Sequence, residues 1–319
     1  MILIVPEAGG DAGVGCLRMA GALSRDAMAA GTRHLARVHA WDASGALPLA
    51  GLLPPETEAT IGVVPLATEY EALVAALVTE LGVLAATGQP LVLAPTAEHM
   101  TGALIALAAA GRLPPLKKWL PSAAGYAASR DKLLLARHLE AAGLGHVAVE
   151  TGSWSEARTF GKPRYGVGSR GCARVQTSAE AELLAAAGHV FQPPLPGPDY
   201  VVDVAAGRAL TRLVHRQRGG ADTQFVYVEE PALEAIAHDV AASLGAPVAN
   251  VQAKKVGDGW RVFDVGTRFS GAACAARLAG VNWLEGLLCE GEGARAATWF
   301  APRFGTMIQR RFEEVMVTQ

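Results

Sequence analysis

Short apolar runs alternate with helical repeats along the first third of the chain. Residues 2–6 form a short β-branched run, which is typical of a strand, and residues 34–41 are expected to form a second strand. Residues 69–84 and 101–111 repeat apolar positions at helical spacing, and the proline-bounded run at 89–95 is continuously apolar, as in a buried parallel strand. This order of elements predicts an open parallel sheet.

The middle of the chain begins after a proline pair at residues 114 and 115, where the composition shifts. A helix is expected from residue 128 to residue 142, with Ser129 or Asp131 as its N-terminal cap and Gly143 as its stop. The shorter elements expected after it are a helix at 153–160, a strand near 172–176, a helix at 178–188 and a strand at 189–192.

The last third of the chain carries the clearest hairpin. Residues 248–256 and 260–265 alternate apolar and polar positions around an Asp-Gly turn at residues 257–259. The other elements expected here are a strand pair at 200–205 and 209–216, an amphipathic helix at 230–244 and a long helix rich in alanine and leucine after Gly271.

The composition narrows the classes of function. A chain of 319 residues can form two domains of ordinary size. Hydrophobic residues make up 51% of it but aromatic residues only 6%, which suits layered α/β packing through small side chains. The formal net charge of −2 gives no reason to expect a nucleic-acid surface.

The cysteines and the terminus indicate a cytoplasmic location. Cys16, Cys172, Cys274 and Cys289 have neither metal-ligand nor redox-motif spacing, so we interpret them as reduced thiols. The N-terminal segment lacks a basic region, and its apolar stretch is too short for that of a signal peptide. Charges, prolines or glycines interrupt every long apolar stretch before it reaches membrane-spanning length, so we expect no contact with a membrane.

A lysine followed by three glycines and a serine is a candidate phosphate-binding segment. These residues lie between Lys162 and Gly171. Backbone amides in such a loop can point at phosphate oxygens, and the lysine supplies a positive charge. The segment is not a P-loop, because the lysine precedes the glycines and no helix is evident after them. The alternative is a glycine-rich turn beside a surface lysine.

The predicted hairpin carries candidate metal ligands. Gln252 and Asp264 stand on its two strands, where they can lie near one another on one face and offer oxygens to Mg²⁺. Arg268 follows at a distance suited to meet a phosphate or a developing anion. The alternative, two solvated strand residues, is weakened because Asp264 lies between Phe263 and Val265.

Two further features leave their interpretation open. Glu98 follows the apolar strand at 89–95, where α/β sheets place their ligands, although a carboxylate at a helix N-terminus is the simpler interpretation. A basic cluster can bind an acidic substrate or form a solvated strand end. Its members are His215, Arg216 and Arg218.

The order and spacing of these motifs resemble the ATP-grasp superfamily. The resemblance covers roughly residues 120–290 and is closest to the branch that contains the large chain of carbamoyl phosphate synthetase and small carboxylate–amine ligases. The motifs that carry it are Asp131-Lys132, Lys162-Pro163, the glycine-rich loop with Gly166, Gly168, Ser169 and Gly171, then Gln192 with Gly197 and Asp199, then Gln252, and last the segment from Asp264 to Gly271.

The resemblance implies a fold and a division into domains. An α/β fold is expected, with a pre-ATP-grasp, Rossmann-like parallel sheet domain at residues 1–115. A two-subdomain α+β ATP-grasp fold is expected to follow, with its small subdomain at 116–190 and its large subdomain at 191–319.

The resemblance also implies roles for individual residues around ATP and Mg²⁺. Lysines contact the phosphates, the glycine-rich loop folds over them, and the turn after the strand at 189–192 holds adenine. The implied ATP-binding residues are Lys132, Lys162, Gly166, Gly168, Ser169, Gly171, Gln192 and Asp199, the implied metal ligands are Gln252 and Asp264, and the implied catalytic residues are Arg268 and Lys162.

One departure from the family pattern bears on turnover. Family members usually have Glu-x-Asn-x-Arg where this chain has Asp264-Val-Gly266-Thr-Arg268. The aspartate is one methylene shorter, and Gly266 supplies no ligand. Either the site holds one Mg²⁺ well and a second only through water or phosphate, or the protein binds nucleotide with weak turnover.

The expected activity is ATP-dependent ligation of a carboxylate to an amine through an acyl phosphate. Small-molecule carboxylates and amines are the expected partners, and a homodimer is the default assembly. A carboxylase or carbamoyl-phosphate-forming component is a second hypothesis, which the lack of a biotin-carrier motif and of a glutaminase domain disfavours. A regulatory or degenerate ATP-binding protein is the third.

Overall fold

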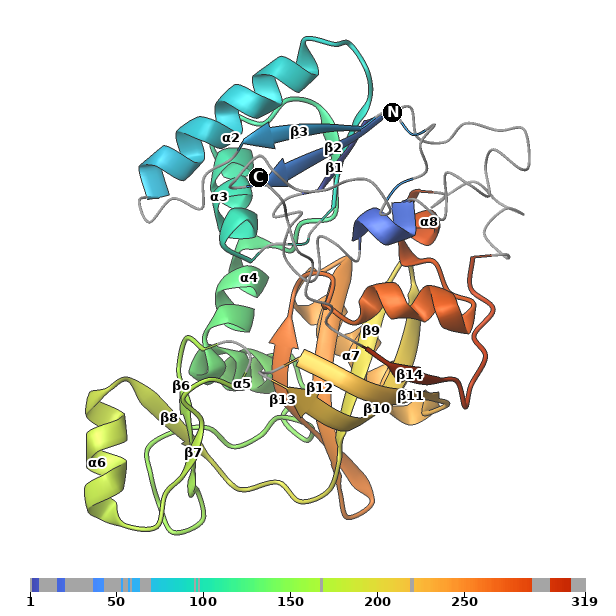
Figure 1. Ribbon diagram of the computed structural model, residues 1–319. Coiled ribbons are helices and arrows are strands. Elements are labelled where there is room, and N and C mark those ends of the chain that lie inside the picture. Colours follow the sequence, from blue (N-terminus) through green and yellow to red (C-terminus); the bar gives the residue numbers. More distant parts are fainter. Residues whose placement is uncertain are drawn as a thin grey trace, which may run out of the picture.

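The computed structural model describes residues 2–5, 16–20, 37–42, 53, 57, 59–63, 70–94, 96, 98–166, 169–218, 221–288 and 299–310. The strands in these ranges form one parallel and two antiparallel sheets. Figure 1 shows the parallel sheet at the top, the largest sheet below it and the smallest sheet at the lower left. This combination of sheets confirms the expected α/β class.

The parallel sheet has the strand order β3-β2-β1-β4-β5. Its strands are β1 (Ile2–Val5), β2 (Arg37–Asp42), β3 (Ala59–Val63), β4 (Leu91–Leu93) and β5 (Leu116–Lys118). Helices α2 (Tyr70–Ala85) and α3 (Glu98–Ala109) bury leucines against Ile2 and Ile4, while Leu3 and Val5 face a second cluster. Both faces are therefore covered, as the continuous apolar runs predict. β5 extends the sheet past residue 115, and the domain boundaries stay a prediction.

The largest sheet is antiparallel, in the order β13-β12-β9-β10-β11-β14. Its strands are β9 (Asp199–Ala205), β10 (Arg208–Arg218), β11 (Ala221–Val228), β12 (Val248–Val256), β13 (Gly259–Gly266) and β14 (Met307–Gln309). Helix α7 (Pro231–Ser243) packs Leu233, Ala237 and Val240 against apolar side chains of β9 and β12. The predicted strand pair and the predicted hairpin are both confirmed.

The smallest sheet has the order β7-β6-β8. Its strands are β6 (Phe160–Pro163), β7 (Ala173–Arg174) and β8 (His189–Gln192), and helix α6 (Ser178–Ala186) covers one face. Thr177 and Glu180 form a capping box at the start of α6, which fixes where this helix begins. The strand expected near 172–176 is confirmed only over two residues.

The helix expected at 128–142 is instead two helices, α4 (Ala123–Arg130) and α5 (Lys132–Ala141). Asp131 separates them in an extended conformation, with φ −116° and ψ 108°. Its carboxylate accepts hydrogen bonds from the amides of Leu133 and Leu134, so the candidate cap Asp131 is confirmed for α5. Gly143, with φ +79°, follows the end of α5 as predicted.

Two other helix predictions are wrong. Residues 153–160 form no helix, because Arg158 donates through Nε to the Ser153 carbonyl and forms an isolated bridge with Ser155. The long helix expected after Gly271 is broken into a 3₁₀ helix, η1 (Ala273–Ala279), and α8 (Trp283–Leu288). Gly280 makes the break with φ +88°, where a Cβ would stand 2.3 Å from the Ala301 carbonyl oxygen.

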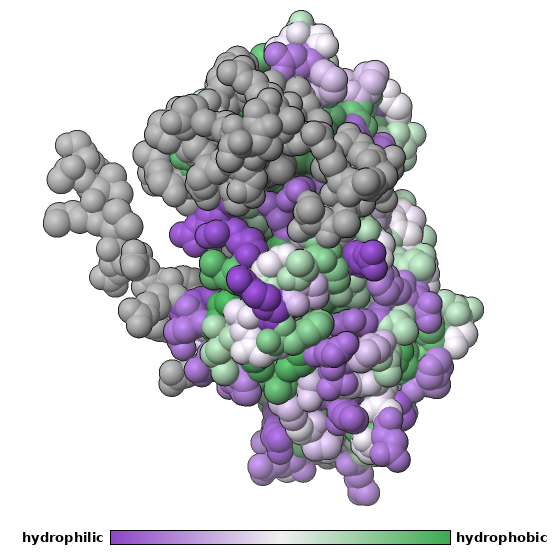
Figure 2. All heavy atoms as spheres, turned by 90° about the vertical axis from the view of Figure 1, so that its right-hand side faces the viewer, coloured by the Kyte–Doolittle hydropathy of each residue, from purple (hydrophilic) through white to green (hydrophobic). Residues whose placement is uncertain are grey.

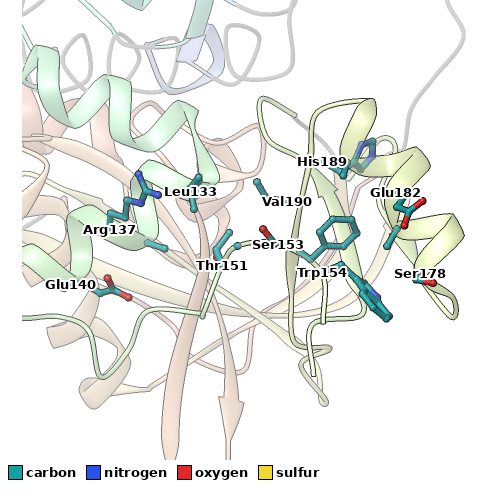
Figure 3. A pocket seen from close by; sticks show the side chains of 15 residues that line it. Leu133, Arg137, Glu140, Thr151, Ser153, Trp154, Ser178, Glu182, His189 and Val190 are labelled. Atoms are coloured by element: carbon teal, nitrogen blue, oxygen red, sulfur yellow. The ribbon is translucent and has the colours of Figure 1, made fainter. Parts of the chain in front are cut away.

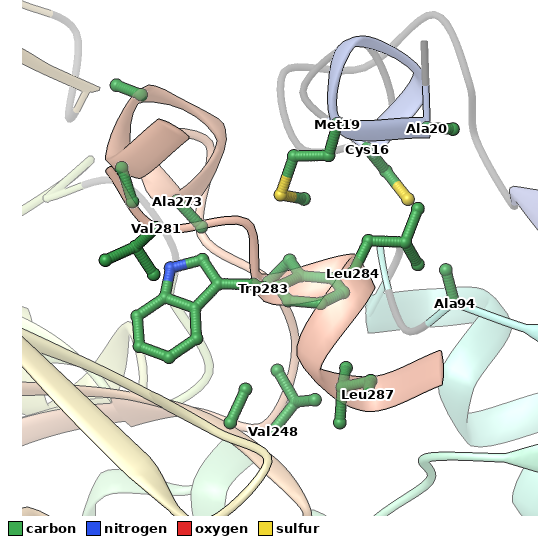
Figure 4. Close-up of a cluster of buried hydrophobic side chains, with 14 of the residues drawn as sticks. Cys16, Met19, Ala20, Ala94, Val248, Ala273, Val281, Trp283, Leu284 and Leu287 are labelled. Carbon is green, nitrogen blue, oxygen red and sulfur yellow. The ribbon is translucent and has the colours of Figure 1, made fainter. Parts of the chain in front are cut away.

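One hydrophobic cluster joins the parallel sheet to the largest sheet. It contains Leu3 and Val5 from β1, side chains of the helical residues 16–20, and Trp283, Leu284 and Leu287 from α8. Figure 4 shows Met19 and Ala94 on one side of Trp283 and Leu284, with Val248 of β12 on the other. This shared core holds the carboxyl ends of the parallel strands close to the antiparallel sheet.

The surface over η1 and β14 mixes hydrophobic and hydrophilic residues (Figure 2). Leu278 and Met307 are among the exposed hydrophobic side chains of these elements. None of the helices in the described ranges combines the length and the hydrophobicity needed to span a membrane. Of the four cysteines, Cys16 and Cys172 are found as free thiols.

Candidate functional site

Two buried lysines mark the centre of the site. Lys132 begins α5 and Lys162 lies in β6, and each exposes only 8% of its surface. In β6, Gly161 faces Leu184 of α6, so the neighbouring Lys162 points to the opposite face of the small sheet. There its ammonium stands 4.5 Å from the ring centre of Phe263 in β13. The lysine therefore bridges the space between the smallest and the largest sheet.

Asp264 lies in the same cluster of charges as both lysines. Burial lowers the pKa of Lys162, and the negative charge of Asp264 counteracts this shift. Burial raises the pKa of Asp264, and the positive charges of Lys132 and Lys162 counteract that shift. These mutual effects place two cations around one carboxylate, as the motif order predicts.

Gln252 and Asp264 stand directly opposite one another in the β12–β13 hairpin. The Gln252 amide nitrogen lies 3.5 Å from a carboxylate oxygen of Asp264. Rotation of the amide would turn the oxygen of Gln252 to the same side, which gives two oxygen ligands. Mg²⁺ is commonly bound by one or two carboxylates together with substrate phosphates, so this donor set fits a nucleotide-bound magnesium ion.

A metal site held by protein alone is not present in the described part of the chain. Its side chains form no group of three histidine, cysteine or acidic residues arranged around a common point. The expectation of Gln252 and Asp264 as metal ligands stays a prediction that depends on phosphate oxygens to complete the coordination.

The glycine-rich loop docks on Lys132. The Lys132 ammonium donates to the carbonyl oxygen of Gly166 at 3.0 Å. Ser169 and Gly171 adopt positive φ values of 56° and 73°, which lets the loop turn back toward β7. Gly168 lies outside the described residues. The carbonyl of Gly171 accepts a hydrogen bond from His189 Nε2 at 3.0 Å, so one end of the loop is held by α5 and the other by β8.

Asp131 fixes the approach to this loop. Its carboxylate, besides capping α5, accepts hydrogen bonds from Arg164 Nε and from the Tyr165 hydroxyl. Burial acts to raise the pKa of Asp131, but the bonds from Arg164, the helix amides and Tyr165 together lower it. One carboxylate thus connects the start of α5 with the start of the glycine-rich loop.

Gln192 and Asp199, which were both expected to bind ATP, have partners of their own. Gln192 is buried at the end of β8, where its amide donates to the Thr151 hydroxyl at 2.9 Å. Asp199 forms an ion pair of 2.9 Å with Lys254 and also contributes to the charge around Lys162. The structure brings Asp199 into the cluster of charges and places Gln192 on the strand next to Lys162.

Arg268 lies beside a group that the motifs did not include. Its Nε stands 3.5 Å from Glu98, and Glu98 also forms an ion pair with Arg130. The position of Glu98 after β4 left a substrate-facing role open, whereas nothing in the sequence distinguished Arg130. The charges of Glu98 and Arg130 both act on the pKa of Asp264, so these two residues lie close enough to belong to the same site.

A buried polar network lies on the same face of the largest sheet as Gln252 and Asp264. Asp203 pairs with Arg212 and accepts hydrogen bonds from Asn250 at 2.9 Å and from Ser270 at 3.0 Å. Arg212 is 2% exposed, so its guanidinium is closed to solvent and to a substrate. In the basic cluster that follows it, His215 is exposed, and the side chains of Arg216 and Arg218 lie outside the described residues. The network could have been found only from strand pairing, which places Asn250 opposite Asp203.

A separate pocket of about 660 Å³ lies beside the site. Arg137 and Glu140 of α5 line one side, and Trp154, Glu182 and His189 line the other (Figure 3). The lining includes Phe191, which packs on α6 and so belongs to the face of the small sheet opposite Lys162. Neither Lys162 nor Asp264 contributes to this pocket, which is therefore distinct from the candidate phosphate site.

Part of the chain matches a known family, and nearly all of it matches solved structures. Residues 188–308 match a family described as ATP-grasp in the biosynthetic pathway with Ter operon. L-amino acid ligase from Bacillus licheniformis superposes with a TM-score of 0.64 at 16% identity, over 91% of this chain and 73% of that one. No curated protein matches the sequence.

Two other structures extend the likeness to almost the full chain. Biotin carboxylase from Campylobacter jejuni, solved as a beta-gamma-ATP complex, gives a TM-score of 0.63 at 14% identity over 97% of this chain and 73% of that one. N5-carboxyaminoimidazole ribonucleotide synthetase from Thermus thermophilus gives a TM-score of 0.60 at 15% identity, over 97% of this chain and 94% of that one. Residues 188–308 thus match the ATP-grasp family model, in a chain that shares its fold with these three enzymes.

Proposed function

We propose that this protein is an ATP-dependent carboxylate–amine ligase that acts through an acyl phosphate in small-molecule or cofactor biosynthesis. The observation that carries the proposal is the cluster of Lys132, Lys162, Gln252 and Asp264 between the smallest and the largest sheet. Its two cations and two potential metal ligands are what a magnesium-bound triphosphate needs.

The first step transfers the terminal phosphoryl group of ATP to a carboxylate. A carboxylate oxygen forms a bond to the γ-phosphorus, the bond from this phosphorus to the β–γ bridging oxygen breaks, and ADP leaves with that oxygen. Lys132 and Lys162 stabilise the charge that spreads over the phosphate oxygens, and Arg268 is placed to steady the transferred group. Asp264 and Gln252 would hold Mg²⁺, which would supply further charge neutralisation.

The second step forms the amide. The amine nitrogen bonds to the acyl carbon, the bond from this carbon to the phosphate oxygen breaks, and the nitrogen loses a proton. Phosphate is a good leaving group, whereas an unactivated carboxylate would have to expel hydroxide. Phosphorylation by ATP therefore makes the attack of the amine possible. The assignment to the branch of carbamoyl phosphate synthetase and small ligases rests on the motif resemblance and is part of this proposal.

The similar structures support the reaction class. One of them is named an amino acid ligase, and another was solved as a complex with beta-gamma-ATP. The glycine-rich loop, held by Lys132 at one end and by His189 at the other, lies where it can cover the phosphates.

Release of ADP and phosphate from purified protein tests this proposal. The protein is incubated with Mg-ATP and with panels of carboxylates and amines, in pairs and singly. We expect at least one pair to stimulate release, and a carboxylate labelled with ¹⁸O should pass one labelled oxygen to the phosphate. Stimulated release without this transfer would contradict the acyl phosphate.

One observation favours a second candidate, an ATP-binding protein with weak or no turnover. Gly266 offers no ligand two residues after Asp264, on the same face of β13. Tight binding of Mg-ATP without stimulated release by any pair of substrates would support this candidate over the ligase.

A further inference from the structure

Two arginines from different segments hold one carboxylate beside Asp264. Arg130, the last residue of α4, forms an ion pair with Glu98 Oε2, and Arg268 Nε lies 3.5 Å from Glu98 Oε1. Glu98 begins α3, and its carbonyl accepts a hydrogen bond from the Tyr126 hydroxyl at 2.8 Å. The parallel sheet, α4 and the end of β13 therefore converge on a single carboxylate.

Gly266 makes room for this arrangement. A Cβ at position 266 would stand 3.8 Å from Glu98 Oε1 and 4.0 Å from the Cβ of Asn250. A longer side chain at position 266 would extend into the space that the Glu98 carboxylate occupies. Because side chains alternate along a strand, this space lies on the same face of β13 as Asp264.

The arginine cluster adjoins the candidate phosphate site. Asp264 is affected by the charges of Lys132 and Lys162 and also by those of Glu98 and Arg130. A carboxylate bound between the two arginines would therefore lie next to the lysines that are proposed to hold the phosphates. This is where the acceptor of a phosphoryl group has to stand.

The cluster is accessible and its ion pairs are exchangeable. The side chains of Arg130, Glu98 and Arg268 are 31%, 20% and 29% exposed, in contrast to the buried Asp203–Arg212 pair. Partly exposed ion pairs contribute little to stability, so a second carboxylate can compete for the same guanidinium groups.

We propose that Arg130 and Arg268 recognise the carboxylate of the acyl substrate, and that Glu98 occupies this site in the free protein and is displaced when the substrate binds. Guanidinium groups match carboxylates in shape and charge, and exchange of one carboxylate for another leaves the net charge of the site unchanged. This inference rests on the proposed ligase function and names the residues that select its substrate class.

Acetate serves as the probe in a nuclear magnetic resonance titration of protein labelled with ¹⁵N-arginine. The Nε–Hε signals of Arg130 and Arg268, assigned through Arg130→Lys and Arg268→Lys, are followed at constant ionic strength with Mg²⁺ and a non-hydrolysable ATP analogue. Glu98→Gln keeps the shape of the side chain and removes the competing charge. In Glu98→Gln we expect the signals of Arg130 and Arg268 to respond at roughly three- to tenfold lower acetate concentration than in the wild type.

Glu150→Gln is the matched control, because Glu150 forms the same kind of ion pair with Arg158 away from the site. It should leave the acetate response of Arg130 and Arg268 unchanged. An equal response in wild type and Glu98→Gln, or equal shifts of all arginine signals, would overturn the carboxylate site. Binding of the ATP analogue is measured in the same samples, so failure of the nucleotide to bind would instead overturn the proposed function on which the inference rests.

Discussion

The side-chain amide of Gln252 lies 3.5 Å from the carboxylate of Asp264, across the paired strands β12 and β13. The turn at residues 257–259 sets the register as far as Ala253 and Val262, and a one-residue irregularity after this pair brings Gln252 opposite Asp264. Asp264 is the only one of the two that carries charge, and two buried lysines surround it. The predictions below start from this pair and extend to the structure that supports it.

Replacement of Asp264 by asparagine should remove turnover and preserve the fold. Asparagine has nearly the same size and shape as aspartate, so the packing around position 264 is kept. We expect ADP release with the best substrate pair to fall by about 100-fold or more, because a ligand of the metal and charge at the phosphates is lost. Asp258→Asn, in the exposed turn of the same hairpin, is the control. Unchanged ADP release in Asp264→Asn would exclude it from the metal site.

Asp131 should make the free energy of unfolding depend on pH in the acidic range. Its pKa lies below the ordinary value of 3.8 in the folded protein, so its contribution to stability is present above pH 3.8 and is lost as the pH falls through the lowered pKa. The substitution Asp131→Asn keeps the helix cap but not the ion pair with Arg164. Urea unfolding followed by circular dichroism should show a smaller loss of stability between about pH 5 and about pH 2 in this variant.

The contrast with Asp131→Ala separates the cap from the ion pair. Alanine removes both, so it should cost a further amount of about 0.5–2 kcal/mol at every pH. Identical pH profiles for wild type and Asp131→Asn would show that the carboxylate of Asp131 does not carry the acid dependence.

The buried pair of Asp203 and Arg212 should be strongly coupled. Arg212→Met leaves the Asp203 carboxylate buried without its cation, so the free energy of unfolding should fall by about 3–5 kcal/mol. The double variant Asp203→Asn with Arg212→Met buries no charge and should lose less than the sum of the two single variants. Additive losses in urea unfolding would argue against a direct interaction in solution.

Replacement of glycine by alanine should change the free energy of unfolding in opposite directions at two positions. A Cβ at Gly125 in α4 would stand 1.8 Å from the Leu244 carbonyl oxygen, so Gly125→Ala should lower the free energy of unfolding by about 1–3 kcal/mol. Gly82 in α2 has no atom within 4 Å of such a Cβ, so Gly82→Ala should raise it by about 0.5–1 kcal/mol. A stable Gly125→Ala variant would contradict the close packing of α4 on the end of α7.

The elements that could be predicted from the sequence are those whose signals are local. The hairpin follows from its Asp-Gly turn and alternating strands, and β1 and β4 follow from their apolar runs, whereas β3 and β5 were not predicted. The break between α4 and α5 could not be predicted, because the residues around Asp131 all tolerate a helix. What stabilises the break is the bond of Asp131 to Arg164, which is 33 residues away in the sequence.

The residues of the candidate site also fall into those that the sequence predicted and those that only the structure reveals. Lys132, Lys162 and Asp264 were found through their order along the chain, and the structure brings their charges together. Arg130 carried no signal, because its ion pair with Glu98 depends on how α3 and α4 pack. The role of Gly266 becomes visible only when Glu98 is seen to lie against it.

Titration of the purified protein with Mg-ATP, in the wild type and in Lys162→Met, is the most direct test of the central claim that this cluster binds the nucleotide. Lys255→Met, an exposed lysine of β12, is the control. We predict saturable binding to the wild type and to the control, and at least about tenfold weaker binding to Lys162→Met, because a charged hydrogen bond to phosphate is lost. Equal affinity in wild type and Lys162→Met would contradict the claim.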